Sequence, residues 1–374
     1  MSTSIKRKVP NRKRKIHRNN TEKLTKLTEK IEIYYKLASV IPMMLFMLLL
    51  IIIFSTAIGS VNVPFKDTVK IILKNWGLIK NITFTEGWES IIFYVRFPRV
   101  ITTILVGAAL GTSGAVMQGM FRNPMADPGI LGVSSGAGFG AVVAIYLGIH
   151  AKSIYFMPLF ASAGALVAAF VVFLLSIKNG KIPVMNMILS GMAVSTFLSA
   201  ITTAILSFAR SDQVKQFLFW TVGSLNGTRW EDVKISVIPI IVCTVILLFF
   251  SKDLNILLLG EEEAQSVGLN PAKTRKLILL LSSILTATAV SVSGTISFVG
   301  LIVPHIIRLL IGPDHRLLIP ASALGGSIFL LLCDLIGRTI VAPGELSVGI
   351  VTSIIGAPYF LILLNRARKE GVAL

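Results

Sequence analysis

Charged residues are scarce in this chain, which excludes an ordinary soluble protein. Only 14% of its 374 residues are Asp, Glu, Lys or Arg, and 54% are hydrophobic, whereas about 25% of the residues of a typical soluble domain are charged. Acidic residues are the scarcest, with 18 against 36 basic ones, so the net charge is +18. This composition predicts a protein that crosses a membrane several times.

Cysteine and catalytic motifs are also nearly lacking. The two cysteines, Cys243 and Cys333, lie in apolar runs and are expected to pack as small hydrophobic side chains. His305 follows Pro304 without other metal-ligating residues nearby, which favours a structural role. The sequence has neither a G-x-x-x-x-G-K-[ST] phosphate loop nor an H-E-x-x-H motif. We therefore predict no catalytic residue, no metal site and no cofactor bound by this chain.

Basic residues gather ahead of the first apolar run, residues 37–60. That run is longer than the core of a signal peptide, so we expect it to be retained as the first transmembrane helix. Residues 1–36 are then a basic cytoplasmic tail that obeys the positive-inside rule and contacts anionic membrane lipid, rather than a nucleic-acid-binding arm. Residues 37–374 are the predicted transmembrane domain.

Apolar stretches with few charges predict about ten transmembrane helices across a hydrocarbon core of about 30 Å, although the stretch at 298–312 is short and contains His305 and Arg308. After residues 37–60 they are residues 97–120, 130–149, 156–177, 183–208, 235–251, 277–296, 298–312, 317–338 and 345–365. Ten spans from a cytoplasmic start return the carboxyl end to the cytoplasm, in agreement with the basic tail Arg366, Arg368 and Lys369. The predicted fold class is all-α and polytopic.

The second and seventh spans share a short pattern. Ser113-Gly114 precedes Pro124 by the same distance as Ser293-Gly294 precedes Pro304. Because the topology carries the two segments through the membrane in opposite directions, we interpret helices 2–5 and 7–10 as an inverted repeat of the kind found in transporters. A chance match is the alternative.

Proline and glycine mark the connection between the second and third spans. Pro124 and Pro128 predict a turn that ends the second helix, because each removes a backbone donor and disfavours helix at the preceding residue. Gly132, Gly136 and Gly140 recur every fourth residue, which predicts a groove where a neighbouring helix can approach closely.

Three long segments resemble the FecCD family, the permeases of ATP-binding-cassette (ABC) importers for iron siderophores, cobalamin and haem. They are residues 96–138, which include RNPMADPGILGVSSGAG, residues 294–326, which include GTISFVGLIVPHIIRLLIGPDHR, and residues 344–364, GELSVGIVTSIIGAPYFLILL. The resemblance implies the type II ABC importer permease fold. It also implies a translocation pathway for an iron–siderophore complex, with cobalamin or haem as the alternative cargo.

The same resemblance implies the partners and the location. The permease is expected to pair with a second permease chain, identical or related, and with two copies of an ATP-binding subunit that uses ATP and Mg. An extracytoplasmic siderophore-binding protein would deliver the cargo. The chain itself would be a transport subunit of the bacterial plasma membrane and not an enzyme.

A polar segment at about residues 255–275, between the sixth and seventh spans, is the candidate contact with the ATP-binding subunit. Carboxylates at its centre suit the start of a helix, Gly268 suits its end, and Asn270-Pro271 suits the start of the next helix. These signals predict two short helices joined by a turn. The resemblance assigns the coupling role to Glu261, Glu262, Glu263, Ala264, Gln265, Val267, Gly268 and Leu269.

Three arginines are candidates for docking the binding protein. Arg96 and Arg99 lie at the outer end of the second span, and Arg338 ends the ninth span four residues after Asp334. In the resembling permeases, arginines at these motif positions bind glutamates of the binding protein through paired hydrogen bonds. The alternatives are interfacial anchoring for Arg96 and Arg99, and an internal ion pair with Asp334 for Arg338.

Small and polar residues on the fifth and tenth spans are candidates for the translocation path, because these two helices line the cavity in the resembling permeases. They are Asn186, Ser190, Gly191, Ser195, Gly349, Thr352 and Gly356. Small residues are equally common where helices merely pack, which is the alternative. An ion-coupled secondary transporter is the alternative function, but it would need ionisable residues in mid-membrane, where this chain has almost none.

Overall fold

The computed structural model describes residues 36–59, 61, 63–75, 77, 79, 87–178, 182–341 and 343–369. The predicted basic tail, residues 1–36, lies outside the described residues except for Lys36. The chain divides into two compact units, residues 1–43 and residues 44–374. The packing described below lies within the second unit.

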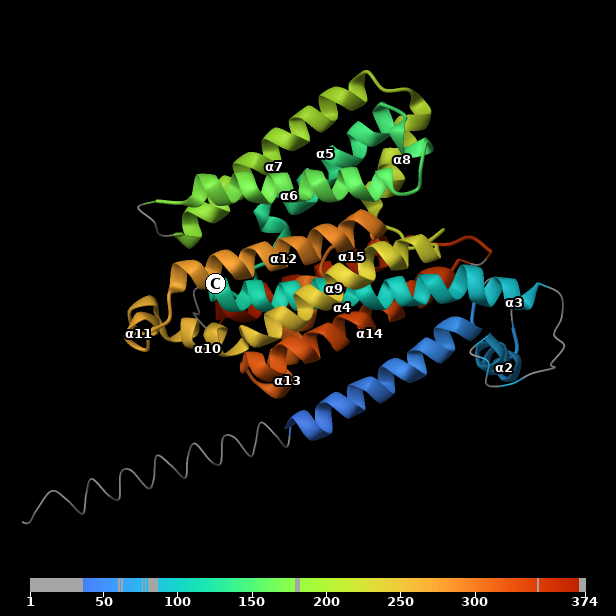
Figure 1. The fold of residues 1–374 in the computed structure, drawn as a ribbon, viewed down its shortest axis with the longest axis horizontal. Helices are drawn as coiled ribbons and strands as arrows, with labels where there is room; N and C mark the ends of the chain where they lie inside the picture. The colour runs from blue at the N-terminus through green and yellow to red at the C-terminus, as the bar shows by residue number, and fades with distance from the viewer. Residues whose placement is uncertain are drawn as a thin grey trace, which may run out of the picture. The chain divides into compact units, whose positions relative to one another are not determined.

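Helices hold most of the described residues (Figure 1). A first helix, Lys36–Ala57, is followed by α2 (Phe65–Asn75), α3 (Trp88–Ser90), the π-helix η1 (Ile91–Arg96), α4 (Phe97–Phe121), the 3₁₀ helix η2 (Pro128–Leu131), α5 (Val133–Tyr146), η3 (Ile149–Ala151), α6 (Phe156–Ser176), α7 (Val184–Ser207), α8 (Ser211–Val222), α9 (Trp230–Phe249), α10 (Ser251–Leu259), α11 (Glu261–Ser266), α12 (Pro271–Ser293), α13 (Val299–Ile311), α14 (His315–Thr339) and α15 (Val348–Lys369).

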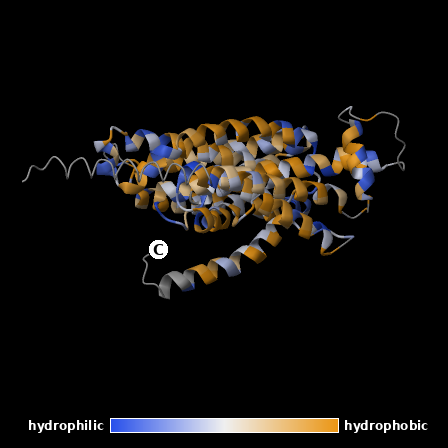
Figure 2. Cartoon of the chain, turned by 90° about the horizontal axis from the view of Figure 1, so that it is seen from below, coloured by the Kyte–Doolittle hydropathy of each residue, from blue (hydrophilic) through white to orange (hydrophobic). Residues whose placement is uncertain are grey.

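Seven helices of the described residues are long and apolar enough to cross a membrane: Lys36–Ala57, Trp88–Phe121, Phe156–Ser176, Val184–Ser207, Trp230–Phe249, Pro271–Ser293 and His315–Thr339. Shorter apolar helices, Val133–Tyr146, Val299–Ile311 and Val348–Leu363, occupy the three other predicted spans. Hydrophobic residues run along the long helices, and hydrophilic ones gather towards their ends (Figure 2). The prediction of an all-α polytopic protein is confirmed.

Besides α3, which precedes the second span, and α10 and α11 of the predicted coupling segment, the helices α2 and α8 lie outside the predicted spans. They contain 11 and 12 residues and carry charged residues at their first turns, so a search for long uncharged stretches passes over them. The second span is also longer than predicted, because the helix begins at Trp88 and passes through η1 into α4.

α4 lies at the centre of residues 44–374, where it packs against α9, α12, α13 and α14 (Figure 1). Glycine permits the closest approaches. A Cβ at Gly114 would lie 1.9 Å from the carbonyl oxygen of Gly300, and one at Gly107 would lie 2.4 Å from that of Gly326. Because these distances are shorter than real Cβ contacts, α13 and α14 can approach α4 this closely only where a side chain is lacking.

The predicted glycine groove is confirmed at two of its three positions. A Cβ at Gly136 would lie 2.4 Å from the carbonyl oxygen of Gly164 in α6, and one at Gly140 would lie 2.0 Å from that of Phe160. For Gly132 the prediction is wrong, because this residue precedes α5 with φ +73 and ends η2. Its lack of a side chain there serves a left-handed backbone conformation.

The predicted turn after the second span is present. α4 ends at Phe121, and Arg122 follows with a left-handed backbone, φ 52. The Asp127 carboxylate then accepts a hydrogen bond from the N–H of Gly129 at 2.7 Å and caps η2.

The two Ser-Gly pairs occupy different positions in their helices. Ser113-Gly114 lies within α4, whereas Ser293 ends α12 and Gly294 caps it. Pro124 lies after the end of α4, whereas Pro304 lies inside α13. The shared spacing is therefore not an equivalence of structural position.

Candidate functional site

The predicted coupling segment, about residues 255–275, covers the second half of α10, all of α11 and the start of α12. α11 begins after Gly260, whose φ of +143 suits glycine, and its first turn carries three glutamates that favour the positive end of the helix dipole. Gly268, with φ +86, ends the segment: its N–H donates to the carbonyl of Gln265, and that of Leu269 donates to Ala264. The predicted helix start and stop are both confirmed.

The next helix is longer than predicted. The Asn270 side chain accepts the N–H of Lys273 at 3.0 Å, and Pro271 occupies the first turn, so the predicted cap is confirmed. However, this helix is α12 itself, which continues to Ser293. The prediction of two short helices joined at this turn is wrong, because the second short helix is α10, which precedes α11.

The three glutamates differ in their surroundings. Glu261 forms an ion pair with Arg275 of α12, whose side chain is 10% exposed. Glu262 and Glu263 are exposed, whereas Ala264 is fully buried. Of the other predicted coupling residues, Gln265, Val267 and Gly268 are exposed and Leu269 is half-buried. Hence Glu261 holds α11 against α12, and the remaining carboxylates face outward.

α10 is tied to the ends of two long helices. Arg122, after α4, donates to the carbonyl of Leu257. The Asn255 side chain donates to Asp314 at 2.8 Å and accepts the backbone N–H of His315 at 2.9 Å, at the start of α14. Sequence reasoning did not single out Asn255, because its partners lie about 60 residues away. A displacement of α10 would therefore be felt by α4 and α14.

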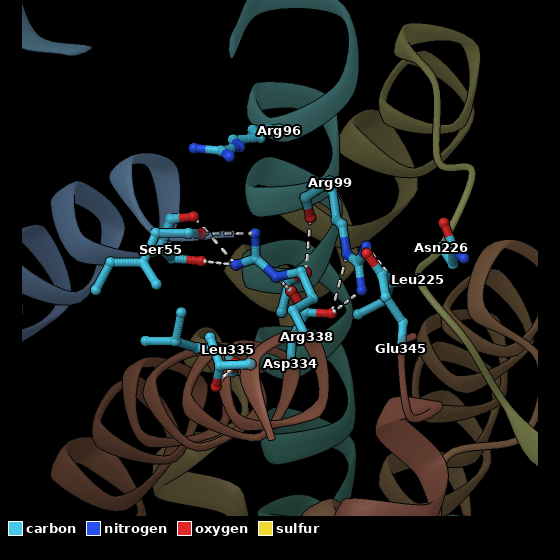
Figure 3. A network of polar contacts seen from close by, with 12 residues as sticks. Ser55, Arg96, Arg99, Leu225, Asn226, Asp334, Leu335, Arg338 and Glu345 are labelled. Atoms are coloured by element: carbon cyan, nitrogen blue, oxygen red, sulfur yellow. Dashed lines mark hydrogen bonds and ion pairs between the residues drawn. The ribbon is translucent and has the colours of Figure 1, made fainter. Parts of the chain in front are cut away.

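A buried network of charges joins the N-terminal end of α4 to the C-terminal end of α14 (Figure 3). Arg99 Nε and Nη2 lie 3.0 and 2.8 Å from Asp334 Oδ1. Arg99 Nη1 lies 2.8 Å from Glu345 Oε2, in the segment before α15. Arg338 Nε lies 3.0 Å from Asp334 Oδ2, which confirms the internal pair considered from the spacing. Two arginines are thus balanced by two carboxylates.

Arg338 of this network and the neighbouring Arg96 bind the end of the first helix. Arg338 Nη2 donates to Ser55 Oγ at 2.5 Å, and the guanidinium of Arg96 donates to the carbonyls of Thr56 and Ala57 at 2.9 and 2.7 Å. Arg96, Arg99 and Arg338 are 4%, 6% and 3% exposed. In this conformation all three guanidinium groups are therefore occupied inside the chain, and docking by them stays a prediction.

A cavity of about 660 Å³ opens between α5, α7, α8 and the start of α13. Its lining is rich in hydroxyl groups, which come from Ser134, Ser135, Ser199, Thr202, Thr203, Thr221, Thr295 and Ser297. Asp127 is the single charged residue among the described lining residues. Burial raises the pKa of the Asp127 carboxyl, and the hydrogen bond from Gly129 lowers it by less.

The predicted path residues of α7 do not line this cavity. Asn186, Ser190, Gly191 and Ser195 lie nearer the start of α7, whereas Ser199, Thr202 and Thr203 face the cavity one to two turns later. An uncharged helix does not reveal in its sequence which of its turns faces a cavity, and the path role of these four residues stays a prediction.

The predicted path residues of α15 mainly pack. A Cβ at Gly349 would lie 1.9 Å from the carbonyl oxygen of Val222, and one at Gly356 would lie 2.4 Å from Phe298 Cγ. Thr352 is fully buried and donates to the carbonyl of Gly349. Gly349 also lines a second cavity of about 460 Å³ with Ser353 and Thr221. Thr352 and Gly356 thus pack closely in this conformation, and their place on the path stays a prediction.

In the part of the chain that the structure describes, histidine, cysteine and carboxylate side chains do not converge. Within the described residues no group of three or more could hold a metal ion. His305, in α13, places its ring 6.4 Å from that of Tyr359.

Comparison with known proteins gives a consistent result. The model of the FecCD transport family matches residues 47–366. Over 280 residues the chain is 46% identical to the cobalamin import system permease protein BtuC of Halobacterium salinarum, covering 75% of this chain and 74% of that protein. It is 37% identical to the hemin transport system permease protein HmuU of Yersinia pestis, covering 88% of this chain and 97% of that one.

The fold also matches a solved structure, the inward-facing conformation of an ABC transporter assigned to the metal-chelate type. The TM-score is 0.77 at 32% identity, and the match covers 88% of this chain and 99% of that chain.

Proposed function

This chain belongs to the FecCD transport family and is a permease subunit of an ABC importer, and we propose that it carries a metal chelate across the plasma membrane. The observation that supports this cargo is the hydroxyl-lined cavity of about 660 Å³. Its volume lies within the usual range of ligand sites, about 300–1,000 Å³. Serine and threonine hydroxyls can hydrogen-bond a bulky polar chelate without the strong attraction of an opposite charge, so they favour passage over retention.

Cobalamin is the first chelate to test, because one of the similar permeases, at 46% identity, carries that name. A haem is the second, since another similar permease is named for hemin. The ferric siderophore predicted from the sequence remains the third candidate. A second permease chain, identical or related, would complete the pathway, and both termini would lie in the cytoplasm.

Energy for transport comes from a separate ATP-binding subunit, and we propose that it contacts the exposed face of α11. Glu262 and Glu263 on that face are available to a partner, whereas Glu261 is engaged by Arg275. α10 then relays a displacement of α11 through Arg122 to α4 and through Asn255 to α14.

A substrate-binding protein delivers the cargo, and its docking at Arg96, Arg99 and Arg338 is a further proposal. The Glu345 side chain, 25% exposed, already binds Arg99. A carboxylate of the binding protein would therefore compete with Glu345 for that guanidinium. Arg96 and Arg338 would have to exchange their bonds to the end of the first helix.

The experiment is uptake by proteoliposomes that contain the purified transporter with its co-isolated subunits. Labelled cobalamin, hemin and a ferric siderophore are offered outside, with hydrolysable ATP or a non-hydrolysable analogue inside. We expect one of the three to accumulate only with hydrolysable ATP. Accumulation driven by a proton or sodium gradient without ATP would instead support the ion-coupled alternative.

A further inference from the structure

A groove of about 860 Å³ lies between α6, the start of α7 and α12, and it shares no lining residue with the hydroxyl-lined cavity. We call it the α6–α12 groove. Its walls consist of aliphatic and aromatic side chains, and several of these side chains are exposed: Phe170 is 60% exposed, Leu174 is 51% exposed and Leu280 is 53% exposed. Large apolar side chains this exposed on transmembrane helices suit contact with lipid chains.

The charged residues of the groove gather at one end, where α12 begins. Lys273 and Lys276 lie one helical turn apart and are both exposed. The Lys276 ammonium lies 5.7 Å from the centroid of the Phe173 ring, over the wall of the groove. No acidic residue is among the described lining residues. The groove therefore combines an apolar body with a positively charged mouth.

The mouth lies at the level of lipid headgroups. The apolar span of α6 ends at Ser176, and that of α12 begins at Pro271. At about 1.5 Å per residue, Lys273 and Lys276 lie roughly 3 and 8 Å along the axis from Pro271. This is the depth at which lysines extend their ammonium groups to the interface.

We propose that the α6–α12 groove binds an anionic phospholipid, with its phosphate between Lys273 and Lys276 and its acyl chains along the walls formed by Phe170, Leu174 and Leu280. Only the choice of leaflet rests on the proposed function. The leaflet is the cytoplasmic one, because α11, the proposed contact with the ATP-binding subunit, lies next to the start of α12. Clusters of basic side chains between transmembrane helices on that side favour such headgroups.

The start of α12 adds to this preference. α12 has 23 residues, and the positive end of its dipole lies at the mouth of the groove. The Asn270 oxygen is used by the N–H of Lys273, so the amide nitrogen is the group that can donate to a phosphate.

A protein partner fits the groove less well. The close helix contacts of this chain use small residues, as at Gly107 with Gly326 and Gly136 with Gly164, whereas the groove is walled by phenylalanine and leucine. A protein surface covering the mouth would also have to desolvate two ammonium groups, which is costly unless carboxylates meet them.

The site adjoins the coupling segment. Asn270 caps α12 directly after α11, and Arg275, between the two lysines in sequence, holds Glu261 of α11. A phosphate on Lys273 and Lys276 would therefore fix the first turns of α12, on which α11 rests.

The first test compares lipid retention by native mass spectrometry of the complete transporter, purified with equal amounts of phosphatidylglycerol and phosphatidylcholine. Lys273→Gln/Lys276→Gln should lower the preference for phosphatidylglycerol by about 30-fold, since each lysine near an anionic lipid contributes a factor of roughly 5. The control Lys152→Gln/Lys215→Gln removes two other exposed lysines and should retain the wild-type preference. Equal retention by the wild type and the Lys273/Lys276 variant would overturn the proposal.

The second test identifies what occupies the groove. Leu174→Cys is labelled with a fluorophore in the complete transporter, where Cys243 and Cys333 are buried. Brominated phosphatidylglycerol should quench the label more strongly than brominated phosphatidylcholine does. Equal quenching, or crosslinking of Cys at this position to a second permease chain or to the ATP-binding subunit, would overturn the proposal. Neither measurement needs the cargo, so these results stand apart from those of the uptake experiment.

Discussion

The Arg99 guanidinium binds Asp334 Oδ1 with two nitrogens, at 3.0 and 2.8 Å, and so joins the N-terminal end of α4 to the C-terminal end of α14 across 235 residues of sequence. Asp334 is 1% exposed and also faces Arg338. One carboxylate therefore compensates much of the positive charge of two buried arginines.

Asp334→Ala should lower the free energy of unfolding by about 3–5 kcal/mol, because it leaves two buried guanidinium groups without their shared carboxylate. Thermal unfolding of the permease in detergent measures the effect. Glu345→Gln is the control: Glu345 is partly exposed and Arg99 keeps Asp334, so we expect a loss below about 1 kcal/mol. Equal losses of unfolding free energy in the two variants would contradict the conclusion that Asp334 is the main counter-charge of both arginines.

Gly268→Pro should leave the permease in the membrane and lower ATP-driven uptake by ~10-fold or more, since proline cannot adopt φ +86 and lacks the N–H that donates to Gln265. Uptake by proteoliposomes measures coupling. Gly148→Pro is a matched control, because Gly148 has φ +67 and donates to Ile145 away from the coupling segment. Normal ATP-dependent uptake by the Gly268→Pro variant would refute the role of α11.

Substitution of the glutamates of α11 should have two different effects, one on partner binding and one on stability. Glu262→Gln/Glu263→Gln should weaken binding of the ATP-binding subunit and reduce its dependence on salt, because exposed charges act mainly by steering association. Glu261→Gln should lower the melting temperature instead, since it leaves the buried Arg275 without its carboxylate. Biolayer interferometry at two salt concentrations, with melting curves in parallel, tests this. The idea fails if only Glu261→Gln changes the affinity.

Asp314 should make stability depend on pH in the acid range. Burial raises the pKa of this carboxyl, but bonds from Arg316 and Asn255 outweigh it and lower the pKa to about 2. Because that value lies below the ordinary one of about 3.9, the stabilisation is present above pH 4 and is lost as the pH falls towards 2. The difference in melting temperature between the wild type and Asp314→Asn should therefore shrink from pH 5 to pH 3.

At Asp253 the pH dependence of stability should have the opposite sign. Burial raises the pKa of the Asp253 carboxyl, so the wild type should gain stability relative to Asp253→Asn as the pH falls. Parallel pH profiles for the two variants would argue against both assignments.

Local signals in the sequence predicted where α11 begins and ends and where α12 begins, but not the length of α12. Gly268 and Asn270-Pro271 act within a few residues of themselves, through a left-handed turn and a side-chain cap. The same signals could not show that Glu261 is engaged and Glu262 is exposed, because that depends on where Arg275 of the next helix lies.

The sequence by itself determined the membrane class, most of the span positions, the turn after α4 and the family, because each depends on apolar length, on proline and glycine, or on contiguous motifs. Only the tertiary structure decided that Arg96, Arg99 and Arg338 are buried, that Ser199 rather than Ser195 faces the cavity, and that Asn255 ties α10 to α14. The reason is physical: these outcomes depend on which helices pack against one another, and contacts between residues about 40 to 283 positions apart leave no pattern in the local sequence.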